Sequence, residues 1–122
     1  SLAMQYLSPL ADAGDADAQH RVAIMCQNGL GVVRNEVRAY KMMLAAAEQG
    51  YAIAQHGIGF MYLEGDCVEQ DSAKAAEWFR KAADQGLAGS LTTLALMYEQ
   101  GNGVEKDPAM AKKLYAEAGF EF

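Results

Sequence analysis

The chain has 122 residues, 52% of them hydrophobic, and a formal net charge of −6. The negative charge disfavours nucleic-acid binding, because an acidic surface repels a phosphate backbone. No stretch approaches the roughly 18 apolar residues of a membrane-spanning helix, so we expect no membrane insertion. The alanine-rich text has only two prolines, which predicts closely packed helices.

One stretch of the sequence occurs three times at a constant spacing. Gly14, Gly50 and Gly86 lie 36 residues apart, and apolar residues at helical spacing follow each of them. Self-similarity at this period is the signature of a solenoid built from two-helix units. We therefore predict an all-α fold in a single α-solenoid domain over residues 3–122. It divides into a half-repeat at 3–13 and three helix-turn-helix repeats at 14–49, 50–85 and 86–122.

The predicted elements are seven helices with no strand. The first contains Pro9, which removes a backbone hydrogen bond and should bend or shorten that helix. Asp15 or Asp17 can cap the second helix. The predicted spans are 3–13, 16–28, 36–49, 52–64, 72–85, 88–100 and 108–119.

The first helix of each repeat, helix A, carries a buried stripe at spacing i, i+4, i+7 and i+8. A small residue beside the stripe, at Ala23, Gly59 and Ala95, allows the partner helix to approach closely. Gly57 and Gly59 cost roughly 1 kcal/mol each relative to alanine, so packing must hold the middle helix A. The stripe residues are Ala18, Val22, Met25 and Cys26, then Ala54, Ile58, Met61 and Tyr62, then Ser90, Leu94, Met97 and Tyr98.

The loops and the second helix of each repeat, helix B, follow the same pattern. Glycines 29, 65 and 101 should end the A helices in the left-handed conformation, and Asn35, Asp71 and Asp107 should cap the B helices. In the second repeat we expect Trp78 and Phe79 to anchor the core together with Tyr62 and Tyr98. The chain ends Gly-Phe-Glu-Phe, so either Phe120 and Phe122 fold back as a lid, or the chain is a fragment, or another chain covers this end.

Residues 52–86 carry the pattern AxAQxxIGxMYxxGxxVxxDxxKAxxWFxKAAxQG, which resembles a Sel1-like repeat, a relative of the tetratricopeptide repeat. The resemblance covers residues 4–122, with departures at Cys26, Met42, Met43 and Cys67. It implies a right-handed α-α superhelix that acts as an adaptor. The implied function is a protein- or peptide-binding scaffold without catalysis or a cofactor.

The alternative class is an enzyme, since some cysteine-rich relatives in this family are associated with β-lactam binding or hydrolysis. Those relatives pair cysteines within each repeat, whereas here Cys26 and Cys67 lie in different repeats, so we expect two free thiols with Cys67 more accessible. His20 and His56 occupy equivalent positions, but a zinc site needs further ligands that the pattern does not offer. A nucleophilic pair of Cys26 and His20 is disfavoured because they point to different helix faces.

The predicted binding site lies on the A helices, which should line the concave face. Ile24, Phe60 and Leu96 form an apolar row at equivalent positions, with polar neighbours beside them, and Phe60 is the expected central anchor. The alternative is that helix B of the next repeat covers the row. The predicted partner-binding residues are His20, Ile24, Gln27, Ile53, His56, Phe60, Leu63, Thr92, Leu96 and Glu99.

The identity of the partner is open at this stage. The acidic charge suggests a protein or peptide segment with some basic character, and the open C-terminal end suggests a contact between copies of the chain. No signal peptide is visible, which by itself says little about the compartment, and we expect a cytoplasmic location. Export stays open, because a chain that starts at Ser1 can lack its native N-terminus.

Overall fold

The computed structural model describes residues 1–121, and all regular structure in that range is helical. The predicted helices are confirmed, with boundaries that agree to within two residues. None of the described helices has the length and apolar character that a membrane crossing requires. The helices are α1 (Leu2–Asp12), α2 (Ala16–Asn28), α3 (Glu36–Glu48), α4 (Ala52–Glu64), α5 (Ser72–Asp84), α6 (Ala88–Gln100) and α7 (Pro108–Glu117).

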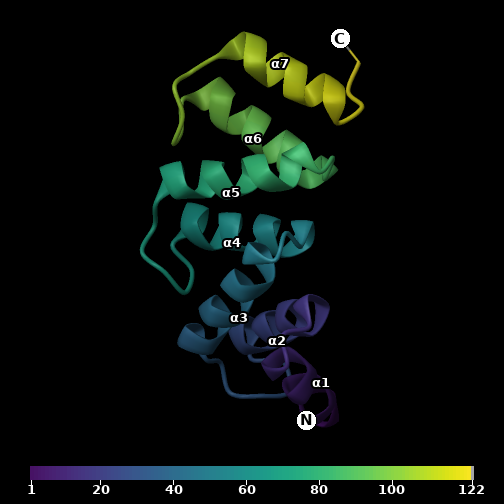
Figure 1. Cartoon of the computed structure of the whole chain (residues 1–122). Helices are drawn as coiled ribbons and strands as arrows, with labels where there is room; N and C mark the ends of the chain where they lie inside the picture. The colour runs from purple at the N-terminus through teal and green to yellow at the C-terminus, as the bar shows by residue number, and fades with distance from the viewer. Residues whose placement is uncertain (122) are drawn as a thin grey trace.

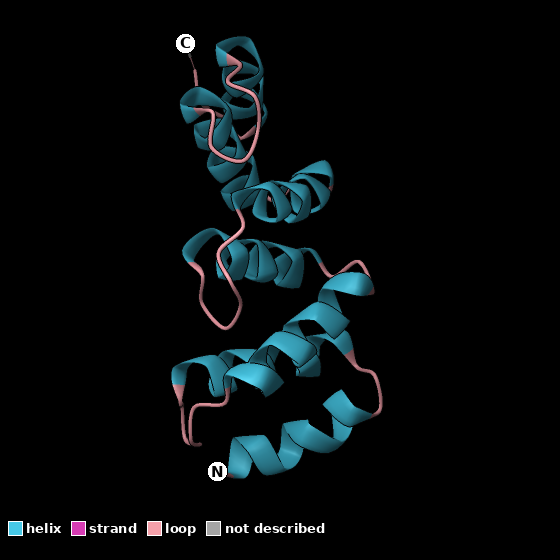
Figure 2. Cartoon of the chain, turned by 90° about the vertical axis from the view of Figure 1, so that its left-hand side faces the viewer, coloured by secondary structure: helices cyan, strands magenta, loops and turns pink. Residues whose placement is uncertain are grey.

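The helices stack in chain order into a right-handed superhelix, with α1 at one end and α7 at the other (Figure 1). The A helices are α2, α4 and α6, and the B helices are α3, α5 and α7. Each B helix makes its most extensive contact with the A helix of its own repeat, and α3 and α5 also pack against the A helix that follows. The loops between A and B helices are long excursions, whereas the B-to-A turns are short (Figure 2). The core lies between successive helices in two clusters, one of buried residues from α1 to α4 and one of buried residues from α5 to α7, and the half-buried Tyr62 packs against both.

The caps that the sequence predicts are present at the ends of the helices. Asp15, rather than Asp17, caps α2, because its Oδ1 accepts a hydrogen bond from the backbone N–H of Ala18 at 2.9 Å. Asn35, Asp71 and Asp107 cap the three B helices in the same way. All three A helices end on glycines in the left-handed conformation, where a Cβ would be strained.

Helix α1 is not shortened at Pro9, and the alternative expectation of a bend at that residue stays a prediction. It continues through Pro9 to Asp12, and the backbone N–H of Ala13 donates to the Pro9 carbonyl at 3.0 Å. Pro9 has no N–H to donate to the carbonyl of Gln5, so the helix lacks that hydrogen bond. Because Pro9 lies in the last turn of α1, the remaining bonds of that turn still form.

The core is centred on fewer aromatic residues than the sequence predicts. Phe79 is fully buried, but Trp78, Tyr62 and Tyr98 are only half-buried and lie at the edge of the core. Lys81 places its Nζ 4.6 Å from the centre of the Trp78 ring, so one face of the indole is turned to a solvated cation. Phe79 is therefore the aromatic anchor, and Trp78 covers the core from outside.

Buried glutamines close the junctions between repeats. Gln19 donates to the Ala11 carbonyl at 3.2 Å and accepts from Gln49 at 2.8 Å. Gln55 and Gln85 repeat the arrangement one repeat later, at 2.9 Å. Because Leu91 stands at the equivalent place in the third repeat, this polar junction occurs twice among the described residues.

The C-terminal end is partly covered by the chain itself. The ring of Phe120 packs edge-on against Tyr115, with 5.4 Å between the ring centroids. This contact matches the predicted folding back of Phe120. The predicted role of Phe122 falls on a residue outside the described range.

Candidate functional site

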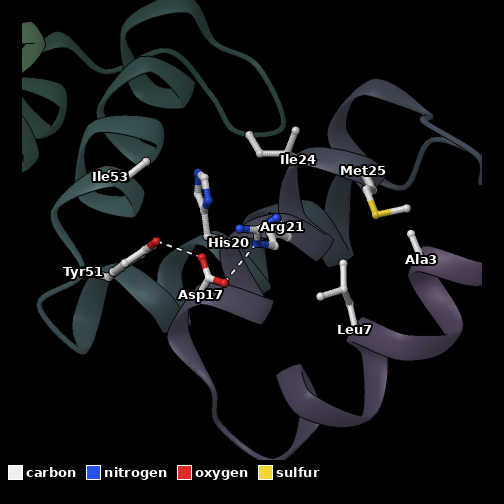
Figure 3. A pocket seen from close by; sticks show the side chains of 9 residues that line it. All are labelled: Ala3, Leu7, Asp17, His20, Arg21, Ile24, Met25, Tyr51 and Ile53. Atoms are coloured by element: carbon white, nitrogen blue, oxygen red, sulfur yellow. Dashed lines mark hydrogen bonds and ion pairs between the residues drawn. The ribbon is translucent and has the colours of Figure 1, made fainter.

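The candidate site is an open groove of about 450 Å³ at the N-terminal end of the superhelix. Three elements form it: α1, the exposed side of α2, and the segment that starts α4. Figure 3 shows their side chains converging on the groove from different parts of the chain. The lining residues are Ala3, Leu7, Asp17, His20, Arg21, Ile24, Met25, Tyr51 and Ile53.

The apolar part of the groove is bordered by Ile24, whose counterpart in the second repeat is the larger Phe60. Leu7 and Ile24 stand where the next repeat has Met43 and Phe60. The Phe60 ring there packs against His56 and Phe79, with centroid distances of 4.9 and 5.0 Å. Phe60 is thus held against the core by neighbouring rings, whereas Ile24 borders the groove.

A hydrogen-bonded triad forms the polar rim of the groove. The hydroxyl of Tyr51 donates to Oδ1 of Asp17 at 2.9 Å, and Nε of Arg21 donates to Oδ2 at 3.0 Å (Figure 3). The hydrogen bonds from Tyr51 and Arg21 lower the pKa of Asp17, and the same contact with Asp17 raises the pKa of Tyr51. Asp17 is therefore a carboxylate and Tyr51 a neutral phenol at physiological pH.

His20 stands in the groove as a half-buried polar group. Its ring meets the ring of Tyr51 edge-on at 5.8 Å, and Figure 3 places it between Tyr51 and Ile24. Burial lowers the pKa of His20, although the charge of Asp17 opposes that shift, so the imidazole is neutral near pH 7. Within the part of the chain that the structure describes, no hydrogen bond satisfies the imidazole nitrogens of His20. One nitrogen can donate to a ligand and the other can accept from it.

The structure separates the predicted site residues into two groups. His20, Ile24 and Ile53 line the groove. Seven residues lie outside it: Gln27, His56, Phe60, Leu63, Thr92, Leu96 and Glu99.

Several of these seven make contacts within the chain. Gln27 donates to Oδ2 of Asp66 at 2.8 Å, and the guanidinium of Arg34 donates to Oδ1 of the same carboxylate. His56 shares a 2.7 Å hydrogen bond with the buried hydroxyl of Ser90, and burial lowers its pKa. The hydroxyl of Thr92 donates to carbonyls of its own helix, at Ala88 and Gly89.

The remaining members of the predicted row differ in exposure. Phe60 and Leu63 are half-buried against the second core cluster, whereas the Leu96 side chain is 44% exposed. Glu99 is exposed and accepts from the hydroxyl of Tyr115 at 3.4 Å. The middle residue of the row of Ile24, Phe60 and Leu96 is thus partly buried against the core.

Six residues that line the groove were not predicted from the sequence: Ala3, Leu7, Asp17, Arg21, Met25 and Tyr51. The spacing of four residues between Asp17 and Arg21 is a visible signal of an ion pair on one helix face. Tyr51 offers no such signal, because it lies 34 residues from Asp17 in sequence. Leu7 and Met25 follow the pattern of core residues, and only the packing of α1 shows that they border a groove.

Metal-binding and nucleophilic chemistry find little support in the described residues. No group of three or more histidine, cysteine or acidic side chains is placed to hold a metal ion among them. Both cysteines are free thiols, Cys26 buried and Cys67 half-buried, as the sequence predicts. Desolvation raises the pKa of Cys67 to about 11, so its thiolate is scarce at neutral pH.

Comparisons with known proteins agree with this architecture. The family model described as the Sel1 repeat matches residues 16–51, 52–87 and 90–119. A Sel1 repeat protein from Oxalobacter formigenes is 36% identical, with a TM-score of 0.86, and the match covers 97% of this chain and 91% of that one. No curated protein sequence matches the chain.

Two further solved structures are similar. The protective antigen c5321 of uropathogenic Escherichia coli is 35% identical with a TM-score of 0.92; the match covers 94% of this chain but only 25% of the antigen. The chain thus spans a quarter of that protein's length. Cysteine-rich protein B of Helicobacter pylori shares the fold at 22% identity and a TM-score of 0.73, over 98% of this chain and 87% of that one. The chain belongs to the Sel1-repeat family.

Proposed function

We propose that this Sel1-repeat chain is a scaffold that binds a segment of a partner protein in the groove between α1, α2 and the start of α4. An apolar side chain of the partner enters the groove against Leu7, Ile24 and Ile53. His20 hydrogen-bonds the partner backbone at the same place. The observation that carries the proposal is the half-buried imidazole of His20 in an apolar groove, with no hydrogen-bond partner among the described residues.

The size of the groove sets how much affinity it can supply. Burying one side chain of leucine size contributes about 1.5–3 kcal/mol, which is far from the roughly 8 kcal/mol of a micromolar complex. The partner must therefore extend beyond the groove. The repeats offer a continuation along the equivalent positions of the next two A helices, at the half-buried Phe60 and the exposed Leu96. The net charge of −6 favours a partner segment with basic residues beside its apolar anchor.

The enzyme alternative has no specific observation in its favour. The family members associated with β-lactam binding or hydrolysis carry cysteine pairs within each repeat. Here Cys26 and Cys67 are unpaired and lie in different repeats. The likeness to the cysteine-rich protein of Helicobacter pylori is one of fold, at 22% identity. We therefore propose a non-catalytic role.

A contact between copies of the chain through the C-terminal end is a second proposal. The contact of Phe120 with Tyr115 covers part of the apolar surface there, which leaves less area for a second copy. Sedimentation of the purified chain at increasing concentration measures this association directly.

The main test compares capture of partners by matched variants. Ile53→Glu places a charge in the groove, and Val33→Glu places the same charge at a highly exposed loop position away from it. We expect a specific set of proteins from the native host to bind the wild type and Val33→Glu but to be lost with Ile53→Glu. A peptide from the captured partner should then bind His20→Ala about fivefold more weakly, the loss of one hydrogen bond. Wild-type affinity of both Ile53→Glu and His20→Ala would show that the partner uses another surface.

A further inference from the structure

His20 and His56 occupy equivalent positions in the first two repeats but have different neighbours. The ring of His56 meets the ring of Phe60 edge-on at 4.9 Å and the ring of Phe79 edge-on at 5.5 Å. Its Nδ1 also shares a 2.7 Å hydrogen bond with the hydroxyl of Ser90, which is fully buried. The second repeat therefore shows how this chain surrounds a half-buried histidine at this position, with aromatic rings on the imidazole and a hydrogen bond at one nitrogen.

The first repeat junction offers His20 neither rings of this kind nor the hydroxyl. A shift back by one repeat replaces Phe60, Phe79 and Ser90 by residues that have no ring and no hydroxyl, namely Ile24, Met43 and Ala54. Among the described residues, His20 meets the ring of Tyr51 at 5.8 Å, and no hydrogen bond reaches its imidazole nitrogens. In this part of the chain, His20 thus lacks the partners that His56 has.

The space beside His20 is open to a side chain from outside. The groove of about 450 Å³ lies next to its ring, with Ile24 and Ile53 at the border. Figure 3 shows the imidazole standing between Tyr51 and Ile24, and the Ile53 side chain is 47% exposed. An aromatic ring that enters the groove can therefore reach the imidazole.

We propose that the partner side chain in this groove is aromatic, and that its ring packs on His20 as the rings of Phe60 and Phe79 pack on His56. This inference rests on the proposed function, since it names the kind of residue that the groove selects from the partner segment. A partner backbone group that hydrogen-bonds His20 takes the part that the Ser90 hydroxyl has for His56. Paired aromatic rings attract each other beyond the area that they bury, which corresponds to about two- to tenfold in affinity.

Two peptides that differ only in one ring test the proposal. Both are about ten residues long and carry lysines around a central anchor, which is phenylalanine in one peptide and cyclohexylalanine, its saturated analogue, in the other. Both rings are apolar and six-membered, so burial of apolar area does not favour phenylalanine. NMR titration of the wild-type chain, followed at the ring protons of His20, should show about two- to tenfold tighter binding of the phenylalanine peptide. That peptide should also cause a ring-current shift at His20, and the His20→Gln variant assigns these signals.

A matched pair of variants places the aromatic ring in the chain itself. Ile24→Phe supplies from within the repeat the ring that Phe60 supplies in the next one, and Val33→Phe adds the same ring at a loop position that is 89% exposed. Ile24→Phe should shift the His20 ring protons without any peptide and weaken the phenylalanine peptide about tenfold or more. Val33→Phe should change neither. Circular dichroism checks that both variants keep their helices, and the comparison of the two peptides on the wild type needs no substitution.

The outcomes separate this inference from the proposed function. If the cyclohexylalanine peptide binds as tightly as the phenylalanine peptide and also shifts His20, the groove is a binding site but its preference for an aromatic ring is wrong. If neither peptide shifts His20 at millimolar concentration, both the inference and the groove as the site of the proposed function are contradicted.

Discussion

Gly59 of α4 faces Phe79 of α5 so closely that a Cβ on Gly59 would lie 2.8 Å from a carbon of the phenyl ring. The residue that lowers the helix propensity of α4 is thus the one that lets the largest buried side chain pack there. Gly57 has a similar relationship to the preceding helix, where its Cβ would lie 2.8 Å from Sδ of Met43. The two glycines of α4 face the two helices that enclose it.

Gly59→Ala should destabilise the chain by about 1–2 kcal/mol, although alanine favours the helix by roughly 1 kcal/mol, because the rigid ring of Phe79 cannot yield. Gly57→Ala should cost less, since its added methyl meets the flexible end of Met43. Urea denaturation of both variants measures the difference. Phe79→Leu in the Gly59→Ala background should recover part of the loss, and a strictly additive double variant would contradict the steric argument.

Phe79→Ala should cost about 3–5 kcal/mol of unfolding free energy, as truncation of a fully buried aromatic residue does. Trp78→Ala should cost less than half as much, because the indole is half-buried and one of its faces meets Lys81. Thermal and urea unfolding of the two variants under one set of conditions compare them directly. Equal losses would place Trp78 in the core after all.

Acidification should destabilise the chain in two separate ranges of pH. Burial lowers the pKa values of His20 and His56 below their ordinary 6.5, so the unfolded chain binds protons first as the pH falls. The free energy of unfolding should be constant above that value and decrease below it, down through the lowered pKa values. The hydrogen-bonded carboxylate of Asp17 adds a second loss only below its ordinary pKa of 3.8.

The double variant His20→Gln, His56→Gln serves as the control for the first range. Its stability should change little between about pH 7 and about pH 5, where that of the wild type declines. Chemical denaturation at a series of pH values gives both curves. Parallel curves for the two proteins would mean that groups other than these imidazoles control the decline.

Cys67 adopts a left-handed backbone conformation, with φ of 68°, where the other two repeats carry Gly31 and Gly103. Cys67→Val should destabilise the chain by about 1–3 kcal/mol, because a β-branched residue is strained in this region. Cys67→Gly should lie near the wild type, since relief of strain offsets the loss of the thiol's contacts. The midpoints of urea unfolding for the two variants test this ordering, and a valine variant as stable as the glycine variant would refute it.

The contrast between Cys67 and Phe60 shows which structural features could be predicted from the sequence. The position of Cys67 at a loop glycine follows from repeat spacing, whereas its left-handed backbone is a finding of the structure. The exposure of Phe60 follows neither from repeat spacing nor from local chain geometry. It depends on how the rings of His56 and Phe79 fill the space beside it, and Phe79 belongs to the next helix.

The candidate groove, too, depends partly on packing between helices that the sequence does not reveal. The sequence predicted that His20, Ile24 and Ile53 share one binding face, because repeat equivalence and helical spacing place them there. It did not predict Leu7 or Tyr51, whose contribution depends on how α1 and the start of α4 pack against α2. Gln27 was predicted as a partner-binding residue, yet its side chain donates a hydrogen bond to Asp66 in the loop of the next repeat.

The amino-acid sequence by itself determined the helices, their caps, the repeat unit and the family, because each of these rests on interactions within a few residues or on a pattern that recurs every 36 residues. The tertiary structure decided which apolar positions became core, which became groove and which stayed exposed. These outcomes depend on the volumes of side chains from different helices that meet in space. Ile24 borders a groove, whereas the larger Phe60 at the equivalent position packs against Phe79 of the neighbouring helix α5.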